Sequence, residues 1–75
     1  MSEYNADLEK GFLPIVGTRV LVIGTRFHGF WGKVVARPES WSKRSIAVKL
    51  DEWDEPVKLF RHNIFTESEV ELMRL

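Results

Sequence analysis

The chain has 75 residues, no cysteine, and 11 basic against 11 acidic side chains, so its formal net charge is zero. This length fits one small domain without a catalytic cleft between domains, and the absence of cysteine excludes disulfides and a cysteine-ligated zinc. No apolar run approaches the roughly 20 residues of a membrane helix, and the polar, acidic N-terminus is unlike a signal peptide. We therefore expect a cytoplasmic protein with no membrane insertion.

The first two predicted strands show the alternation of a pleated, half-buried strand. Residues 1–12, which precede them, lack a period and indicate a flexible acidic leader. The strands are expected at about 18–23 and 32–37. Their inward-facing residues are expected to be Val20 and Val22 in the first strand, and Val34 and Ala36 in the second.

Further short strands complete the predicted fold. One is expected at 44–50 and another at 56–60, and 61–65 favours a single helical turn followed by a brief closing strand. The apolar face of the first of these strands is formed by Ile46, Val48 and Leu50. Short strands at this spacing predict a mainly β protein, with a single small five-stranded barrel over 13–65.

The C-terminal residues carry the signature of a helix start. Thr66 and Glu69 have the spacing of a capping box, in which each residue satisfies a backbone N–H of the other. We therefore expect a short C-terminal helix or tail over 66–75.

Basic residues gather in the middle of the chain. From Leu13 to Lys49, seven basic side chains stand against Glu39 alone, a local balance of +6. The seven are Arg19, Arg26, Lys33, Arg37, Lys43, Arg44 and Lys49. Acidic residues concentrate in the leader, in 51–55 and in 67–71. This segregation indicates either a basic and an acidic face or strands that pair complementary charges, and the sequence leaves both open.

Large aromatic residues lie in or beside predicted loops, where the ligand of a barrel filled by side chains must bind. The candidate binding residues are Arg26, Phe27, His28, Phe30 and Trp31 after the first strand, Trp41, Lys43 and Arg44 after the second, and Trp53 in the acidic loop. Rings beside cations suit single-stranded nucleic acid and also protein hot spots. Phe27 and Phe30 could instead seal the end of the barrel. Trp53 suits a basic protein partner, or a cation of its own sheet.

Glycines are expected to shape the loop after the first strand. Gly24, Gly29 and Gly32 lie where the backbone must turn sharply, and glycine adopts a positive φ without steric penalty.

The sequence lacks the motifs of catalysis and metal binding. It has no phosphate-binding loop, no nucleophile elbow and no HExxH motif. His28 and His62 have no carboxylate at ligand spacing, and the acidic run at 51–55 lacks the glycine of a calcium loop. We expect no enzymatic activity, no cofactor and no metal.

The segment 17–35 resembles a KOW motif, the strand–loop–strand unit of NusG-type transcription elongation factors and several ribosomal large-subunit proteins. The resemblance is carried by Gly17-x-x-Val20-x-Val22, then Gly24 and Phe27-x-Gly29-x-x-Gly32-x-Val34-Val35. It implies an SH3-like barrel and a transcription- or translation-associated accessory protein. The expected partner is then nucleic acid, RNA rather than DNA, or the surface of a polymerase or ribosome.

A weaker resemblance connects the same Gly-x-x-Val-x-Val opening to small SH3-like accessory subunits of photosynthetic electron-transfer complexes. It implies a protein-docking subunit of a larger complex that binds no nucleic acid. A third interpretation is a homodimer formed through an exposed strand edge or aromatic patch.

Overall fold

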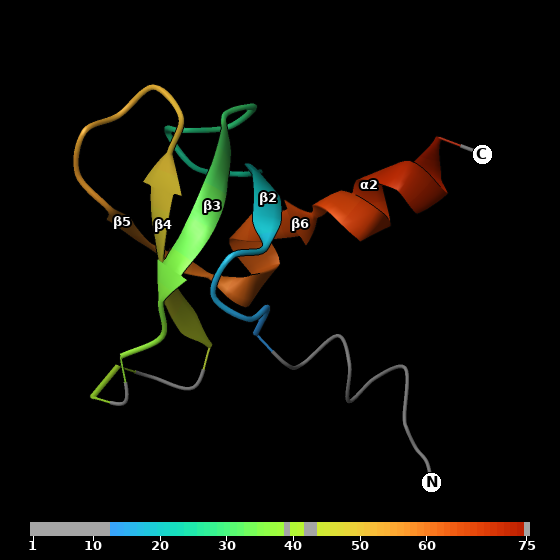
Figure 1. Ribbon diagram of the computed structural model, residues 1–75. Helices are drawn as coiled ribbons and strands as arrows, with labels where there is room; N and C mark the ends of the chain where they lie inside the picture. The colour runs from blue at the N-terminus through green and yellow to red at the C-terminus, as the bar shows by residue number, and fades with distance from the viewer. Residues whose placement is uncertain (1–12, 39, 42–43, 75) are drawn as a thin grey trace, which may run out of the picture.

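The computed structural model describes residues 13–38, 40–41 and 44–74 and shows a mainly β fold with a short C-terminal helix (Figure 1). The strands are β2 (Arg19–Val22), β3 (Trp31–Ala36), β4 (Ser45–Leu50), β5 (Val57–Phe60) and β6 (Ile64–Thr66). The 3-10 turn η1 (Arg61–Asn63) precedes β6, and α2 (Glu67–Met73) follows it. The leader expected at 1–12 lies outside the described residues. No helix in the described part of the chain has the length and apolar character needed to cross a membrane.

The five strands form one antiparallel sheet in the order β5-β4-β3-β2-β6. Three consecutive hairpins place β2 to β5 side by side, and β6 returns to pair with the free edge of β2. The edge strands β5 and β6 have no ladder between them among the described pairings, so the sheet is a half-barrel. The expected mainly β class is confirmed, whereas closure of the barrel is not shown.

The inner face of the curled sheet forms the core. Eight side chains on it are buried: Val20, Val22, Val34, Ile46, Val48, Leu50, Leu59 and Ile64. Phe27 and Phe30 are partly buried against this cluster, which confirms that they seal its end. The alternation that places Val20 and Val22 inward and the apolar face expected for β4 are both confirmed.

A β-bulge in β3 makes the expected position of Ala36 wrong. Val34 pairs with Val48, but Ala36, not Val35, pairs with Ala47, so Val35 is the extra residue. One inserted residue reverses the side-chain alternation beyond it. Ala36 therefore lies opposite Ala47 on the outer face and is not a member of the core.

The glycines have two different roles. Gly24 and Gly29 adopt positive φ angles of 73° and 92°, as expected for the turns of their loop. Gly32 has no positive φ and lies within β3, so its expected turn is wrong. A Cβ on Gly32 would lie 2.8 Å from both the Lys49 carbonyl oxygen and a Val48 methyl carbon. Its function is to let β3 and β4 approach closely.

The predicted capping box begins α2. The Thr66 hydroxyl accepts a hydrogen bond from the Glu69 backbone N–H at 3.2 Å, and the Glu69 carboxylate accepts one from the Thr66 N–H at 2.9 Å. The second Glu69 oxygen accepts from the Arg61 guanidinium at 2.7 Å, and Arg61 also donates to the Ile64 carbonyl at 3.0 Å. Arg61 thus ties α2 to β6 and η1.

We predict that Gly32→Ala lowers the free energy of unfolding by about 1–3 kcal/mol, because the new methyl group meets backbone that must move apart. The measurement is urea unfolding followed by tryptophan fluorescence. The control is Lys33→Ala at the neighbouring exposed position, expected to change stability by no more than about 0.5 kcal/mol. Equal stability of Gly32→Ala and wild type would show that β3 and β4 do not need this close approach.

Stability is expected to fall in acid because of Glu69. Burial of this carboxyl acts to raise its pKa, but hydrogen bonds from Thr66 and Arg61 outweigh burial and hold the pKa below its ordinary value of 4.5. Since the folded pKa is the lower one, the stabilisation is complete above about pH 4.5 and is lost as the pH falls through the folded value.

Glu69→Gln tests this prediction, because glutamine can still complete the capping box. We expect the variant to lose about 1 kcal/mol at neutral pH and to show a weaker decline in acid, measured by urea unfolding across pH. Glu71→Gln, on the same helix and exposed, is the control. Identical pH profiles for Glu69→Gln and wild type would contradict the prediction.

Candidate functional site

The outer face of the sheet, opposite the core, carries a row of cations. Arg19 on β2 pairs with Lys33 on β3, and Lys33 pairs with Lys49 on β4. Residues that pair directly have their Cβ atoms about 4.5–5.5 Å apart, so like charges are neighbours across three strands. Lys58, paired with Ala47, brings a fourth cation to this face from β5. The directly paired residues of this row carry like charges, whereas the complementary pair Arg19–Asp51 joins β2 to the residue that follows β4.

Two carboxylates lie near this row: Asp51, whose hydrogen bonds raise the pKa of Arg19, and Glu67, whose charge raises it further. Asp51 accepts two hydrogen bonds from the Arg19 guanidinium, at 2.8 and 3.0 Å. These bonds lower the pKa of Asp51, and the nearby charges of Lys49 and Lys33 lower it further. The Arg19 guanidinium carbon also lies 5.5 Å from the centre of the Trp31 ring. The Arg19 guanidinium therefore contacts both Asp51 and Trp31.

Aromatic rings lie among these cations. Trp31 lies beside the β2–β3 loop, as expected: it is the first residue of β3 and pairs with Leu21 on the outer face. The Lys58 ammonium lies 5.1 Å from the centre of the Trp41 ring and 5.8 Å from that of Phe60. We call this surface the outer basic face: Arg19, Lys33, Lys49 and Lys58 with Trp31, Trp41 and Phe60.

Small side chains underlie part of the outer basic face. Ser45 and Ala47 alternate with the core residues of β4 and so belong to the outer side, yet they are only 1% and 6% exposed. Their partners on β5 are Phe60 and Lys58, the latter also lying against Trp41. The small side chains of Ser45 and Ala47 leave room above them for larger neighbours. Phe60 and Trp41 are the aromatic groups of this part of the face.

The two predicted binding loops lie at opposite ends of the sheet (Figure 1). The β2–β3 loop at 23–30 and the β4–β5 loop at 51–56 share one end, where the Phe27 and Trp53 rings meet edge-on at 5.5 Å. The β3–β4 loop, which carries Trp41, is at the other end. A compact ligand cannot contact both predicted loops, whereas a ligand that crosses the outer basic face can.

The β2–β3 loop is held by its own side chains. His28 Nδ1 accepts a hydrogen bond from the Gly24 N–H at 2.8 Å, and the Arg26 guanidinium lies 4.9 Å from the centre of the Phe27 ring. Phe27 and Phe30 face the core. Arg26 and His28 are the exposed candidates in this loop, and their contact with a ligand stays a prediction.

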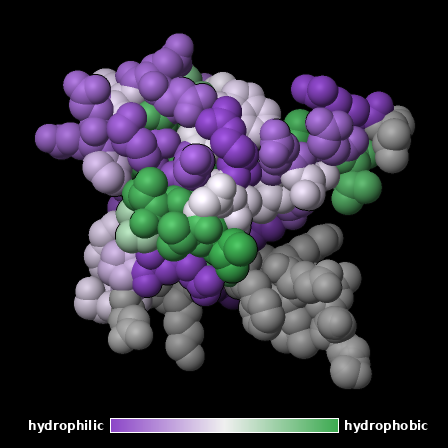
Figure 2. Space-filling model, viewed as in Figure 1, coloured by the Kyte–Doolittle hydropathy of each residue, from purple (hydrophilic) through white to green (hydrophobic). Residues whose placement is uncertain are grey.

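The end with the acidic loop has the opposite character to the outer basic face. Trp53 is 43% exposed and packs against Phe27. A hollow of about 400 Å³ beside it is lined by Glu52, Trp53, Asp54 and Glu55. Figure 2 shows the hydrophilic surface of this end. The carboxylates repel phosphate, so this end is unsuited to nucleic acid.

An apolar patch lies beside the entry to β2 (Figure 2). Ile15, Val16 and Val35 are 69%, 57% and 39% exposed. The Gly17 N–H donates to the Val34 carbonyl at 2.8 Å, which holds this segment against β3. Exposed apolar residues grouped in this way are typical of protein contacts.

The sequence-based candidates only partly coincide with the outer basic face. Trp31 and Trp41 belong to it, whereas Lys43 lies outside the described residues. Arg44 is exposed, and its carbonyl accepts the Arg61 N–H at 2.8 Å. Sequence reasoning left five residues of this face out of the candidate set: Arg19, Lys33, Lys49, Lys58 and Phe60. The period of two placed the four cations opposite the core, but only the register of the strands brings them together.

No known protein family, curated protein or solved structure matches this chain. Among the described residues, no group of three or more His, Cys, Asp or Glu side chains could hold a metal ion. The functional proposal therefore rests on the geometry of the outer basic face.

Lys33→Glu is expected to stabilise the fold by about 0.5–1 kcal/mol at low salt, because it replaces two repulsive cross-strand pairs with attractive ones. Lys33→Gln only removes the repulsion and should give a smaller gain. Urea unfolding at low and high salt measures both, and salt should reduce the difference. A loss of stability in Lys33→Glu at low salt would mean that the row is not repulsive.

Proposed function

We propose that this chain is a non-catalytic binding module that holds single-stranded nucleic acid across its outer basic face. The observation that carries the proposal is the row of Arg19, Lys33 and Lys49. Like charges directly opposite each other disfavour the folded state, and this cost is offset when phosphates approach the row. We therefore assign these cations to ligand binding, since their repulsion does not stabilise the fold.

The aromatic rings complete such a site. Bases of a single strand stack on exposed rings in a way that tolerates any sequence, while cations follow the backbone. Trp31 lies at one end of β3 and Trp41 follows its other end, so the rings flank the row of cations. The six residues of β3 extend about 20 Å, enough for a site of at least about four nucleotides.

The fold supports a specific version of this proposal. A KOW-type SH3-like barrel is compatible with five antiparallel strands in this order and with Gly24 and Gly29 at positive φ. On that basis we propose a transcription- or translation-associated accessory protein whose ligand is RNA rather than DNA. The polymerase or ribosome surface beside such RNA is the proposed setting.

A docking role without nucleic acid is the second candidate. It is favoured by the exposed Trp53 ring, which lies among carboxylates and packs on Phe27. In protein hot spots, an aromatic side chain of this kind becomes buried when the partner binds, and polar or charged residues surround it. The ligand in that case is a basic protein surface, and neutralising the acidic loop at 51–55 would weaken its binding.

The first proposal is tested by fluorescence anisotropy with labelled single-stranded RNA and DNA of about ten nucleotides across a salt series. We expect binding that weakens with salt, and affinity at least about tenfold weaker in the double variant Lys33→Glu/Lys49→Glu. For every phosphate that the variant no longer neutralises, the salt slope should become shallower by about 0.7. The two new carboxylates remain a like-charged pair, so this variant keeps the repulsion of the original pair.

The matched control is Arg74→Glu at the end of α2, compared with the single variant Lys33→Glu, because each reverses one charge and only Lys33 belongs to the outer basic face. Arg74→Glu should retain most of the affinity. Equal weakening in these two single variants would show that net charge alone drives binding. Absence of binding at low salt would reject the proposal and favour the docking candidate.

A further inference from the structure

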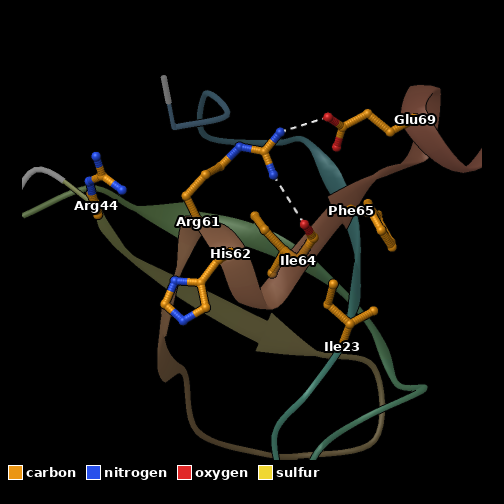
Figure 3. Close-up of a pocket in the computed structure, with 7 residues that line it drawn as sticks. All are labelled: Ile23, Arg44, Arg61, His62, Ile64, Phe65 and Glu69. Atoms are coloured by element: carbon orange, nitrogen blue, oxygen red, sulfur yellow. Dashed lines mark hydrogen bonds and ion pairs between the residues drawn. The ribbon is translucent and has the colours of Figure 1, made fainter. Parts of the chain in front are cut away.

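A hollow of about 350 Å³ lies against η1 and β6 (Figure 3). It is lined by Ile23, Arg44, Arg61, His62, Ile64, Phe65 and Glu69. This volume is near the lower end of the ~300–1,000 Å³ typical of small-ligand sites. It therefore fits one ring system with a substituent, not a folded partner.

The walls of the hollow differ in character. In Figure 3, the apolar side chains of Ile23 and Phe65 lie to one side, and Arg44 and His62 lie to the other. Both Arg44 and His62 are exposed, and Ile23 and Phe65 are half-buried. A flat apolar wall opposite a cation and an imidazole matches a ring that carries an anionic group.

Arg61 lines the hollow, but its terminal nitrogens are already hydrogen-bonded within the protein and do not serve a ligand. Its side chain is 15% exposed, and its two terminal nitrogens donate to the Ile64 carbonyl and to Glu69. Its Nε is buried and has no hydrogen-bond partner among the described residues. Glu69 balances the charge of Arg61, and Arg61 forms a wall of the hollow.

The hollow is continuous with the outer basic face. Phe60 belongs to that face, and its ring stacks on His62 with the centres 5.9 Å apart and 12° between the planes. Lys58 lies 5.8 Å from the Phe60 ring. His62 therefore stacks on Phe60 of the outer basic face and also lines the hollow. A nucleic acid strand that stacks on these two rings would reach the hollow.

We propose that this hollow receives one unstacked nucleobase of the strand bound on the outer basic face, against Phe65 and Ile23, with its phosphate toward Arg44 and His62. This inference rests on the proposed function and adds to it a position that reads a single nucleotide. The base enters the hollow with its edge first, and the base of the neighbouring nucleotide stacks on the Phe60–His62 pair.

Phe65→Leu tests the inference, because leucine keeps an apolar wall and removes the flat ring. In the anisotropy assay with RNA of about ten nucleotides, we expect about tenfold weaker binding. The salt slope should stay unchanged, since the cations that face the phosphates are all retained. The matched control is Phe27→Leu at the opposite end of the sheet, which should bind as wild type does.

A second readout uses small probes and the amide resonances of ¹⁵N-labelled wild-type protein. Uridine 5′-monophosphate should shift the resonances of Ile23, His62 and Phe65 saturably, and ribose 5-phosphate and inorganic phosphate should shift them much less. Equal shifts with inorganic phosphate would show that the hollow binds an anion without recognising the base, and would overturn the inference.

The outcomes separate the two proposals. RNA binding that is abolished in Lys33→Glu/Lys49→Glu but unchanged in Phe65→Leu overturns the inference and leaves the proposed function standing. RNA binding that weakens in Phe65→Leu but not in Phe27→Leu supports the inference. No RNA binding in the wild-type protein overturns both.

Discussion

The close approach of β3 and β4 at Gly32 is the constraint on which the rest of the molecule depends. With backbone and a Val48 methyl 2.8 Å from where a Cβ would be, the two central strands can pack only because this position has no side chain. The sheet curls around eight buried apolar residues. In a chain this short, nearly every large aliphatic group in the strands is used for that core.

Because the inner face takes the aliphatic side chains, the outer face is left to charged and aromatic ones. A sheet stabilised only for folding would place opposite charges side by side on its exposed face. Here Arg19, Lys33 and Lys49 are neighbours, and the carboxylate at their edge, Asp51, is held by Arg19. The directly paired cations of this face repel one another, and the proposed function rests on this feature.

Most of the opposite charges are kept apart by the topology of the half-barrel. The hairpin loop at 51–55 carries most of its carboxylates to one end of the sheet, and α2 carries Glu71 beyond β6. Two carboxylates pair with cations, Asp51 with Arg19 and Glu69 with Arg61, and the charge of Glu67 also acts on Arg19. The result is a basic sheet face with an acidic end.

Much of this was determined by the sequence alone. Alternation within 18–23 and 44–50 predicted which residues form the core, because a period of two can bury only one face. The capping box at Thr66 and Glu69 predicted the start of α2, since both partners lie within one turn. The positive φ of Gly24 and Gly29 followed from their place in a tight loop. These features depend on neighbours along the chain.

Only the tertiary structure decided the features that depend on register between strands. The bulge at Val35 moved Ala36 to the outer face. Register also aligned Lys33 with Lys49 and brought Lys58 against Trp41. Local patterns state which face a side chain occupies but not which side chain lies opposite it, because pairing is set by bulges and hairpin lengths. The core was therefore readable from the sequence, whereas the candidate binding face was not.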